Sequence, residues 1–102
     1  MEIRKRTVDI RGMQNAERDL SELIKEEEYS KIIGASLEGT KLTLVFEVDG
    51  NGKKVRAYVK QISKKKYARV DDFFLRYSNV NHPVAVVETP KYWLLFSNKN
   101  LK

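Results

Sequence analysis

Apolar and polar residues alternate along several segments of the chain, and a period of two predicts β-strands. The alternation is clearest between residues 42 and 48, where every second residue is apolar: Leu42, Leu44, Phe46 and Val48. An apolar segment from Ile32 to Leu37 precedes it, and Gly39-Thr40 between the two fits a two-residue turn. The pattern therefore predicts a β-hairpin over residues 32–48.

A helix is predicted between this hairpin and a charge-rich first strand. The first strand runs from Ile3 to Ile10, is expected near a sheet edge and ends at Gly12. Asn15 is a suitable N-cap for a helix that extends to about Glu28. Its apolar residues have the spacing of one helix face: Ala16, Leu20, Leu23 and Ile24.

The second half of the chain predicts the same order of elements. These are a strand over residues 55–60, a helix from Ser63 to about Asn79, and a hairpin formed by Pro83 to Glu88 and Lys91 to Ser97. Sliding residues 33–46 by 50 positions gives five identities, where average composition predicts about one. The identical pairs are Ala35/Ala85, Glu38/Glu88, Lys41/Lys91, Leu44/Leu94 and Phe46/Phe96.

The repeat predicts an α+β fold made by internal duplication of a 50-residue β-α-β-β motif. The two units, residues 1–50 and 51–102, are related by a pseudo-two-fold axis, and their helices pack on antiparallel sheets. Because a unit of about 50 residues is marginal alone, we expect one domain over residues 1–102 in which the units share a core.

Composition and charge narrow the classes of function. The chain has no cysteine, which excludes disulfides and thiolate chemistry and fits an intracellular protein. It shows neither a signal peptide nor a membrane span. The net charge is +6, but it is −3 over residues 1–50 and +9 over residues 51–102. Part of the basic charge is therefore expected to be neutralised within the molecule.

Candidate catalytic and metal-binding residues are few. His82, the only histidine, follows Asp71 and Asp72 on the predicted second helix, but no nucleophile motif accompanies it, so a polar loop residue is the favoured interpretation. Glu26-Glu27-Glu28 fits a solvated helix end better than a metal site. The sequence therefore predicts no enzyme activity, no cofactor and no metal.

A basic and aromatic sheet face is the strongest candidate for binding. If Leu94 and Phe96 point into the core, Trp93 and Leu95 point to the opposite side, together with the neighbouring strand's Arg56, Tyr58 and Lys60. Such a face suits a protein partner or single-stranded nucleic acid. The alternative is that Trp93 and Leu95 are buried where the two units meet.

Three consecutive lysines, Lys64, Lys65 and Lys66, are a second candidate. They lie at the predicted start of a helix, where positive charge opposes the helix dipole. They fit either an anion-binding helix start or a solvated helix end.

A short, cysteine-free, charge-rich chain of two 50-residue β-α-β-β units resembles the small duplicated proteins encoded by filamentous viruses of hyperthermophilic archaea. The resemblance implies the cytoplasm of the host cell, an internally pseudo-symmetric α+β fold and a binding role.

The sequence predicts a non-enzymatic binding module. The leading hypothesis is that a protein or peptide binds a groove between the two units, beside exposed strand edges, with Trp93, Tyr58, Arg56 and Lys60 as anchors. The alternative is nucleic-acid binding through the basic second half.

Overall fold

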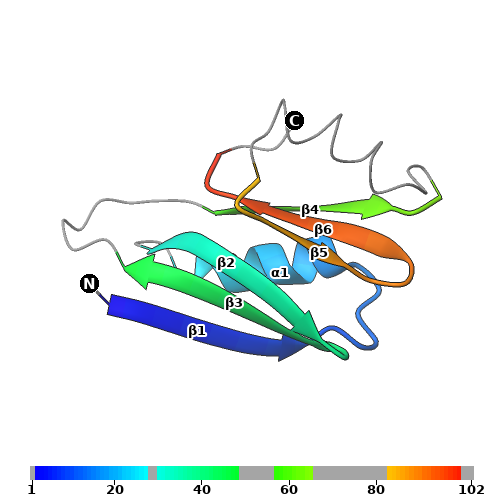
Figure 1. The fold of residues 1–102 in the computed structure, drawn as a ribbon, viewed down its shortest axis with the longest axis horizontal. Helices are drawn as coiled ribbons and strands as arrows, with labels where there is room; N and C mark the ends of the chain where they lie inside the picture. The colour runs from blue at the N-terminus through cyan, green and yellow to red at the C-terminus, as the bar shows by residue number, and fades with distance from the viewer. Residues whose placement is uncertain (1, 28–29, 49–56, 66–82, 100–102) are drawn as a thin grey trace.

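The computed structural model describes residues 2–27, 30–48, 57–65 and 83–99. They form one helix and two three-stranded antiparallel sheets, a mixed α+β arrangement (Figure 1). In chain order the elements are β1 (Glu2–Asp9), α1 (Ala16–Lys25), β2 (Ser30–Glu38), β3 (Lys41–Val48), β4 (Tyr58–Ser63), β5 (Ala85–Glu88) and β6 (Tyr92–Ser97). The helix expected between Ser63 and Asn79 falls largely outside the described residues.

The first sheet has the strand order β1-β3-β2. Because β1 and β2 both run antiparallel to β3, they are parallel to each other but separated by β3, and α1 makes the crossover between them. The hairpin of β2 and β3 closes at Glu38 and Lys41 around the two-residue turn predicted from the sequence, where Gly39 adopts a φ of 63°. A register shift between Ile32 and Gly34 leaves Ile33 exposed, while Ile32 is fully buried.

The second sheet has the corresponding order, β4-β6-β5. Leu94 on its central strand lies between Gln61 and Val87, as Leu44 in the first sheet lies between Arg6 and Ala35. Corresponding residues of the two sheets therefore differ in number by 50 on the central strands β3 and β6, by 55 on β1 and β4, and by 52 on β2 and β5. A gapless offset of 50 holds for β3 and β6 only.

Helix α1 begins where the sequence predicts it, but it ends at Lys25, three residues before the predicted end near Glu28. The backbone of Asn15 is extended, and its side chain accepts a hydrogen bond from the backbone N–H of Arg18 at 3.0 Å, as expected of an N-cap. Glu17 and Asp19 lie in the first turn and Lys25 in the last, which suits the helix dipole. The predicted apolar face is confirmed, since Ala16, Leu20 and Ile24 are buried and Leu23 is packed against them.

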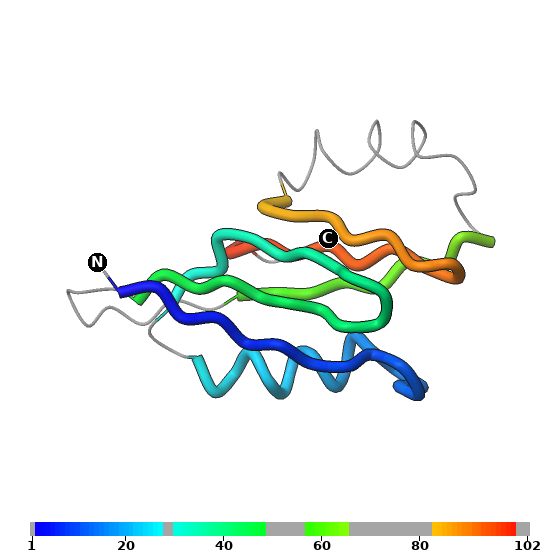
Figure 2. The backbone as a smooth tube through the Cα atoms, turned by 60° about the horizontal axis from the view of Figure 1, so that its bottom comes forward, coloured from blue at the N-terminus to red at the C-terminus, as the bar shows by residue number. Residues whose placement is uncertain are grey.

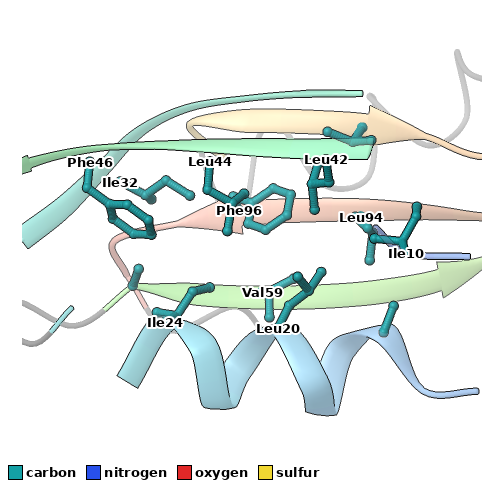
Figure 3. Packing of buried hydrophobic residues seen from close by; sticks show 13 residues of the cluster. Ile10, Leu20, Ile24, Ile32, Leu42, Leu44, Phe46, Val59, Leu94 and Phe96 are labelled. Atoms are coloured by element: carbon teal, nitrogen blue, oxygen red, sulfur yellow. The ribbon is translucent and has the colours of Figure 1, made fainter. Parts of the chain in front are cut away.

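Both sheets and the helix bury side chains in one hydrophobic core (Figure 3). Its largest fully buried members come from α1, from β2 and β3, and from β6: Leu20, Ile32, Leu42, Leu44, Phe46, Leu94 and Phe96. Burial of each such side chain stabilises the fold by about 1.5–3 kcal/mol. The inner faces of the two sheets are therefore joined by packed side chains.

The elements surround this core in a simple way. Strand β2 of the first sheet lies beside β5 of the second, and α1 lies against β4 at the other side of the core (Figure 2). Helix α1 thus closes the core where the two sheets diverge. Strand β1 is at the margin of the first sheet, and its prediction as an edge strand is confirmed.

Candidate functional site

Trp93 lies on the face of the second sheet that the alternation predicts, and of the two alternatives that the sequence left open, exposed or buried, the structure shows the buried one. Trp93 and Leu95 lie on the side opposite Leu94 and Phe96, in a separate cluster with Ile62. Trp93 is only 3% exposed and Leu95 is fully buried. They are therefore neither surface anchors nor part of the core between the sheets, and a role for Trp93 as an exposed binding residue is corrected to a structural one.

The other predicted anchors are only partly described. Tyr58 and Lys60 are half-buried on the same face as Leu95, because Lys60 lies directly opposite Leu95 in the β4–β6 pair. Arg56 lies outside the described residues, as do His82 and Lys66.

Lys64 is engaged within the molecule. Its Nζ is 2.6 Å from Oε1 of Glu88 and 4.7 Å from the centre of the Trp93 ring, a combined ion pair and cation–π contact. Lys65 is exposed. The described part of the lysine run therefore holds its first ammonium against the second sheet rather than presenting it to a ligand.

The edge of β4 is covered by α1. The backbone N–H of Gln61 donates to a carboxylate oxygen of Glu17 at 2.9 Å, and the backbone N–H of Glu17 donates to the side-chain oxygen of Gln61 at 3.3 Å. One pair of residues thus satisfies an edge amide of the sheet and an amide in the first turn of the helix. This part of the edge is not available to another strand.

The edge of β2 is covered in a similar way by Asn98. Its side-chain oxygen accepts from the backbone N–H of Ile32 at 2.8 Å, and its side-chain nitrogen donates to the Ile32 carbonyl at 2.9 Å. A single amide side chain therefore makes the two hydrogen bonds that a neighbouring strand would make. It also ties the end of β6 to the first sheet.

Charged residues connect β1 to the end of α1. Arg6 contacts Glu27 at 3.1 Å and Glu26 at 3.2 Å, and Nη1 of Arg4 is 3.6 Å from Oε2 of Glu27. The hydrogen bonds to Glu26 and then Glu27 raise the pKa of Arg6 above its ordinary value. The side chain of Glu27 is only 6% exposed, so its interpretation as part of a solvated helix end is wrong.

The outer edge of β1 differs from these covered edges. The backbone N–H of Ile10 donates to the Thr40 carbonyl at 2.9 Å. Because hydrogen-bonded and non-hydrogen-bonded residue pairs alternate along an antiparallel ladder, this bond shows which residues of β1 are hydrogen-bonded to β3. The even-numbered amides of β1 consequently face β3, and the odd-numbered residues turn their N–H and C=O groups outward. We call these outward backbone groups the β1 edge: Ile3, Lys5, Thr7 and Asp9.

The β1 edge is long, regular and accessible. Strand β1 pairs with β3 over eight residues without a register shift, and the four residues of the β1 edge are all exposed. Among the described residues, none pairs with this outer side. The edge can therefore accept a further strand.

Residues 2–27, 30–48, 57–65 and 83–99 hold no group of three acidic or histidine side chains arranged for a metal ion. Within the same ranges, no helix has the length and apolar character needed to cross a bilayer. Comparison of the chain with protein-family models, with curated proteins and with solved structures finds no match.

Proposed function

We propose that the protein is a non-enzymatic interaction module that binds an extended segment of a protein partner at the β1 edge by strand addition. The observation that carries the proposal is the difference between the edges. Part of the β4 edge is covered by Glu17 and part of the β2 edge by Asn98, and β5 lies beside β2, whereas β1 presents a regular row of outward backbone groups. Such a row gives affinity through main-chain hydrogen bonds.

This proposal moves the binding site away from a groove between the two halves of the chain. Where such a groove was expected, β2 lies beside β5 and the inner faces of the sheets share a filled core. Leu42, Leu44 and Leu94 in that core have no exposed surface. A peptide at that junction would have to displace packed side chains, whereas a strand added to β1 displaces only water.

Duplication of a β-α-β-β unit with a pseudo-two-fold relation is part of the same proposal. The equal strand orders of the sheets and the shared offset of 50 between β3 and β6 support it. Because the offsets on the flanking strands are 55 and 52, duplication must have been followed by insertions or deletions of a few residues in one of the two halves. On this view the binding strand arose by divergence, because β4, the counterpart of β1, is covered by α1.

A proline at position 7 tests the proposal. The Thr7 amide points outward, so proline removes an edge donor while the main-chain hydrogen bonds of β1 to β3 are kept; proline and valine both remove the hydrogen bond between the Thr7 and Thr43 hydroxyls. Thr7→Val is the matched control, since it keeps the amide and changes only the side chain. Peptides selected from an extended-peptide library on the wild-type protein should bind Thr7→Pro at least about tenfold more weakly and Thr7→Val within about twofold.

The emission of the single tryptophan, Trp93, reports whether each variant is folded. The proposal is wrong if no peptide binds, or if Thr7→Pro is folded and binds the selected peptides as the wild type does. Retention of DNA or RNA at low ionic strength, with log affinity falling linearly with log salt, would instead favour nucleic-acid binding through the basic second half.

A further inference from the structure

The side chains along the β1 edge restrict which strand can pair with it. The side chains of Lys5, Thr7 and Asp9 project from the outer face of the sheet. Those of Arg6 and Val8 project from the core side, where Arg6 forms its salt bridge with Glu27. In antiparallel pairing, residues directly opposite each other share a face, and like charges placed opposite are destabilising. The charge order of the edge therefore selects both a partner and a register.

A second copy of β1 fits this edge in one antiparallel register. When Thr7 lies opposite Thr7 of the partner subunit, Lys5 lies opposite the partner's Asp9 on both sides of the two-fold axis. On the core side Arg6 then lies opposite the partner's Val8. The outward N–H groups of each strand also face outward C=O groups of the other, so that about six main-chain hydrogen bonds can form.

The neighbouring registers lack this complementarity. Moving the partner so that the axis passes through Arg6 brings two arginines into opposition, and an axis through Lys5 does the same with two lysines. Moving it the other way, to an axis through Val8, places Lys5 opposite the partner's Arg11. Of these four registers, only the one centred on Thr7 joins opposite charges and opposes no like charges.

We infer that the partner of the β1 edge is a second copy of this chain, paired through β1 in the register centred on Thr7. The inference rests on the proposed function, because it specifies the occupant of the same edge. The two first sheets then form one six-stranded sheet, with order β2-β3-β1 followed by its two-fold mate.

Other features of β1 support this occupant. Arg4 and Arg6, which could repel a second basic strand, are paired with Glu26 and Glu27 of their own chain. The Asp9 carboxylate accepts a hydrogen bond from the Arg11 amide at 2.9 Å, which with the Thr40 hydroxyl lowers the pKa of Asp9 and keeps it ionised opposite a lysine. Lysine on an edge strand commonly discourages pairing, but in this register Lys5 meets an opposite charge.

The area of one strand pair is small, so the dimer is weak, with a dissociation constant of about 10–100 µM. Analytical ultracentrifugation of the full chain between about 1 and 500 µM should show a reversible monomer–dimer equilibrium. Thr7→Pro should remain monomeric over this range, whereas Thr7→Val should dimerise. A wild-type chain that stays monomeric at the highest concentration overturns the inference.

Charge reversal tests the register. Lys5→Asp and Asp9→Lys each place like charges opposite one another in their own homodimers, so each variant alone should dimerise at least tenfold more weakly. Mixed in equal amounts, the two variants join opposite charges at both positions and should form a heterodimer. Absence of a heterodimer, or unchanged dimerisation of the single variants, contradicts the register.

A cysteine scan gives an independent readout because the chain has no cysteine of its own. In the inferred register the two Thr7 Cα atoms are about 5.5 Å apart, within reach of a disulfide, while the two Lys5 Cα atoms are about 14 Å apart. Mild oxidation should link Thr7→Cys into dimers and leave Lys5→Cys as monomers. Equal linkage of both would refute the register.

These results separate the inference from the proposed function. If the wild type is monomeric but selected peptides bind it and not Thr7→Pro, self-pairing is wrong and the interaction module stands. If neither dimers nor peptides depend on position 7, both are wrong.

Discussion

Replacement of Asn98 by alanine should destabilise the protein by about 2–4 kcal/mol. The Asn98 side chain makes both hydrogen bonds of the Ile32 backbone, at 2.8 and 2.9 Å, and Ile32 has no exposed surface. Alanine leaves a buried N–H and a buried C=O without partners, and each such group costs about 1–3 kcal/mol. Because small domains are stable by only about 5–15 kcal/mol, the variant should lose a large part of its stability.

Urea unfolding followed by Trp93 emission measures this loss, and the melting temperature should fall by about 10–25 °C. Asn98→Asp keeps the acceptor for the Ile32 amide but turns a carboxylate toward its carbonyl, so it should cost about 1–3 kcal/mol. Lys99→Ala, at an exposed neighbouring position, should change stability by less than about 0.5 kcal/mol. A loss below about 0.5 kcal/mol in Asn98→Ala would refute the view that this side chain joins the two sheets.

Three further predictions concern buried or paired groups. Glu27→Ala should cost about 1–2 kcal/mol in urea unfolding because it removes a buried carboxylate that pairs with Arg4 and Arg6, whose side chains are 53% and 38% exposed. Glu26→Ala, at a 65% exposed side chain, should cost less than about 0.5 kcal/mol, and equal losses would contradict the burial of Glu27. Burial raises the pKa of the Tyr92 phenol, so its contribution to stability is present below about pH 10 and is lost as the pH rises through the folded value. Tyr92→Phe should therefore flatten the fall of the urea midpoint between about pH 9 and 11, and an unchanged slope would count against this. Trp93→Ala, followed by circular dichroism because it has no tryptophan, should cost about 3–5 kcal/mol in urea unfolding. Native Trp93 emission should be blue-shifted and poorly quenched by acrylamide, and strong quenching would place Trp93 at the surface.

Most elements of the first half could be predicted because local signals agree there. The Asn15 cap, the apolar face of α1 and the Gly39 turn all act within a few residues, and each is found where the sequence placed it. The opposite faces of Leu94 and Trp93 also follow from the period of two alone. Strand β4, by contrast, extends three residues beyond the predicted end at Lys60.

Exposure and edge protection could not be predicted because they depend on contacts distant in sequence. Alternation shows that Trp93 faces away from Leu94, but not whether that face is covered. The sequence does contain a signal for these contacts at Gln61 and Arg6, because both are polar residues at core-facing positions of their strands. Such side chains require partners, which here are the backbone N–H of Glu17 for Gln61 and the carboxylate of Glu27 for Arg6.

Amide hydrogen exchange along β1 tests the open edge most directly, because the strand contains its own control. At about 1 µM, mass spectrometry with residue resolution should find the outward amides of Lys5 and Thr7 exchanging fast and the inward amides of Arg4 and Arg6 exchanging slowly. At about 500 µM, the outward amides should become protected as the second strand pairs. Outward amides already as slow as the inward ones at the low concentration would contradict the account.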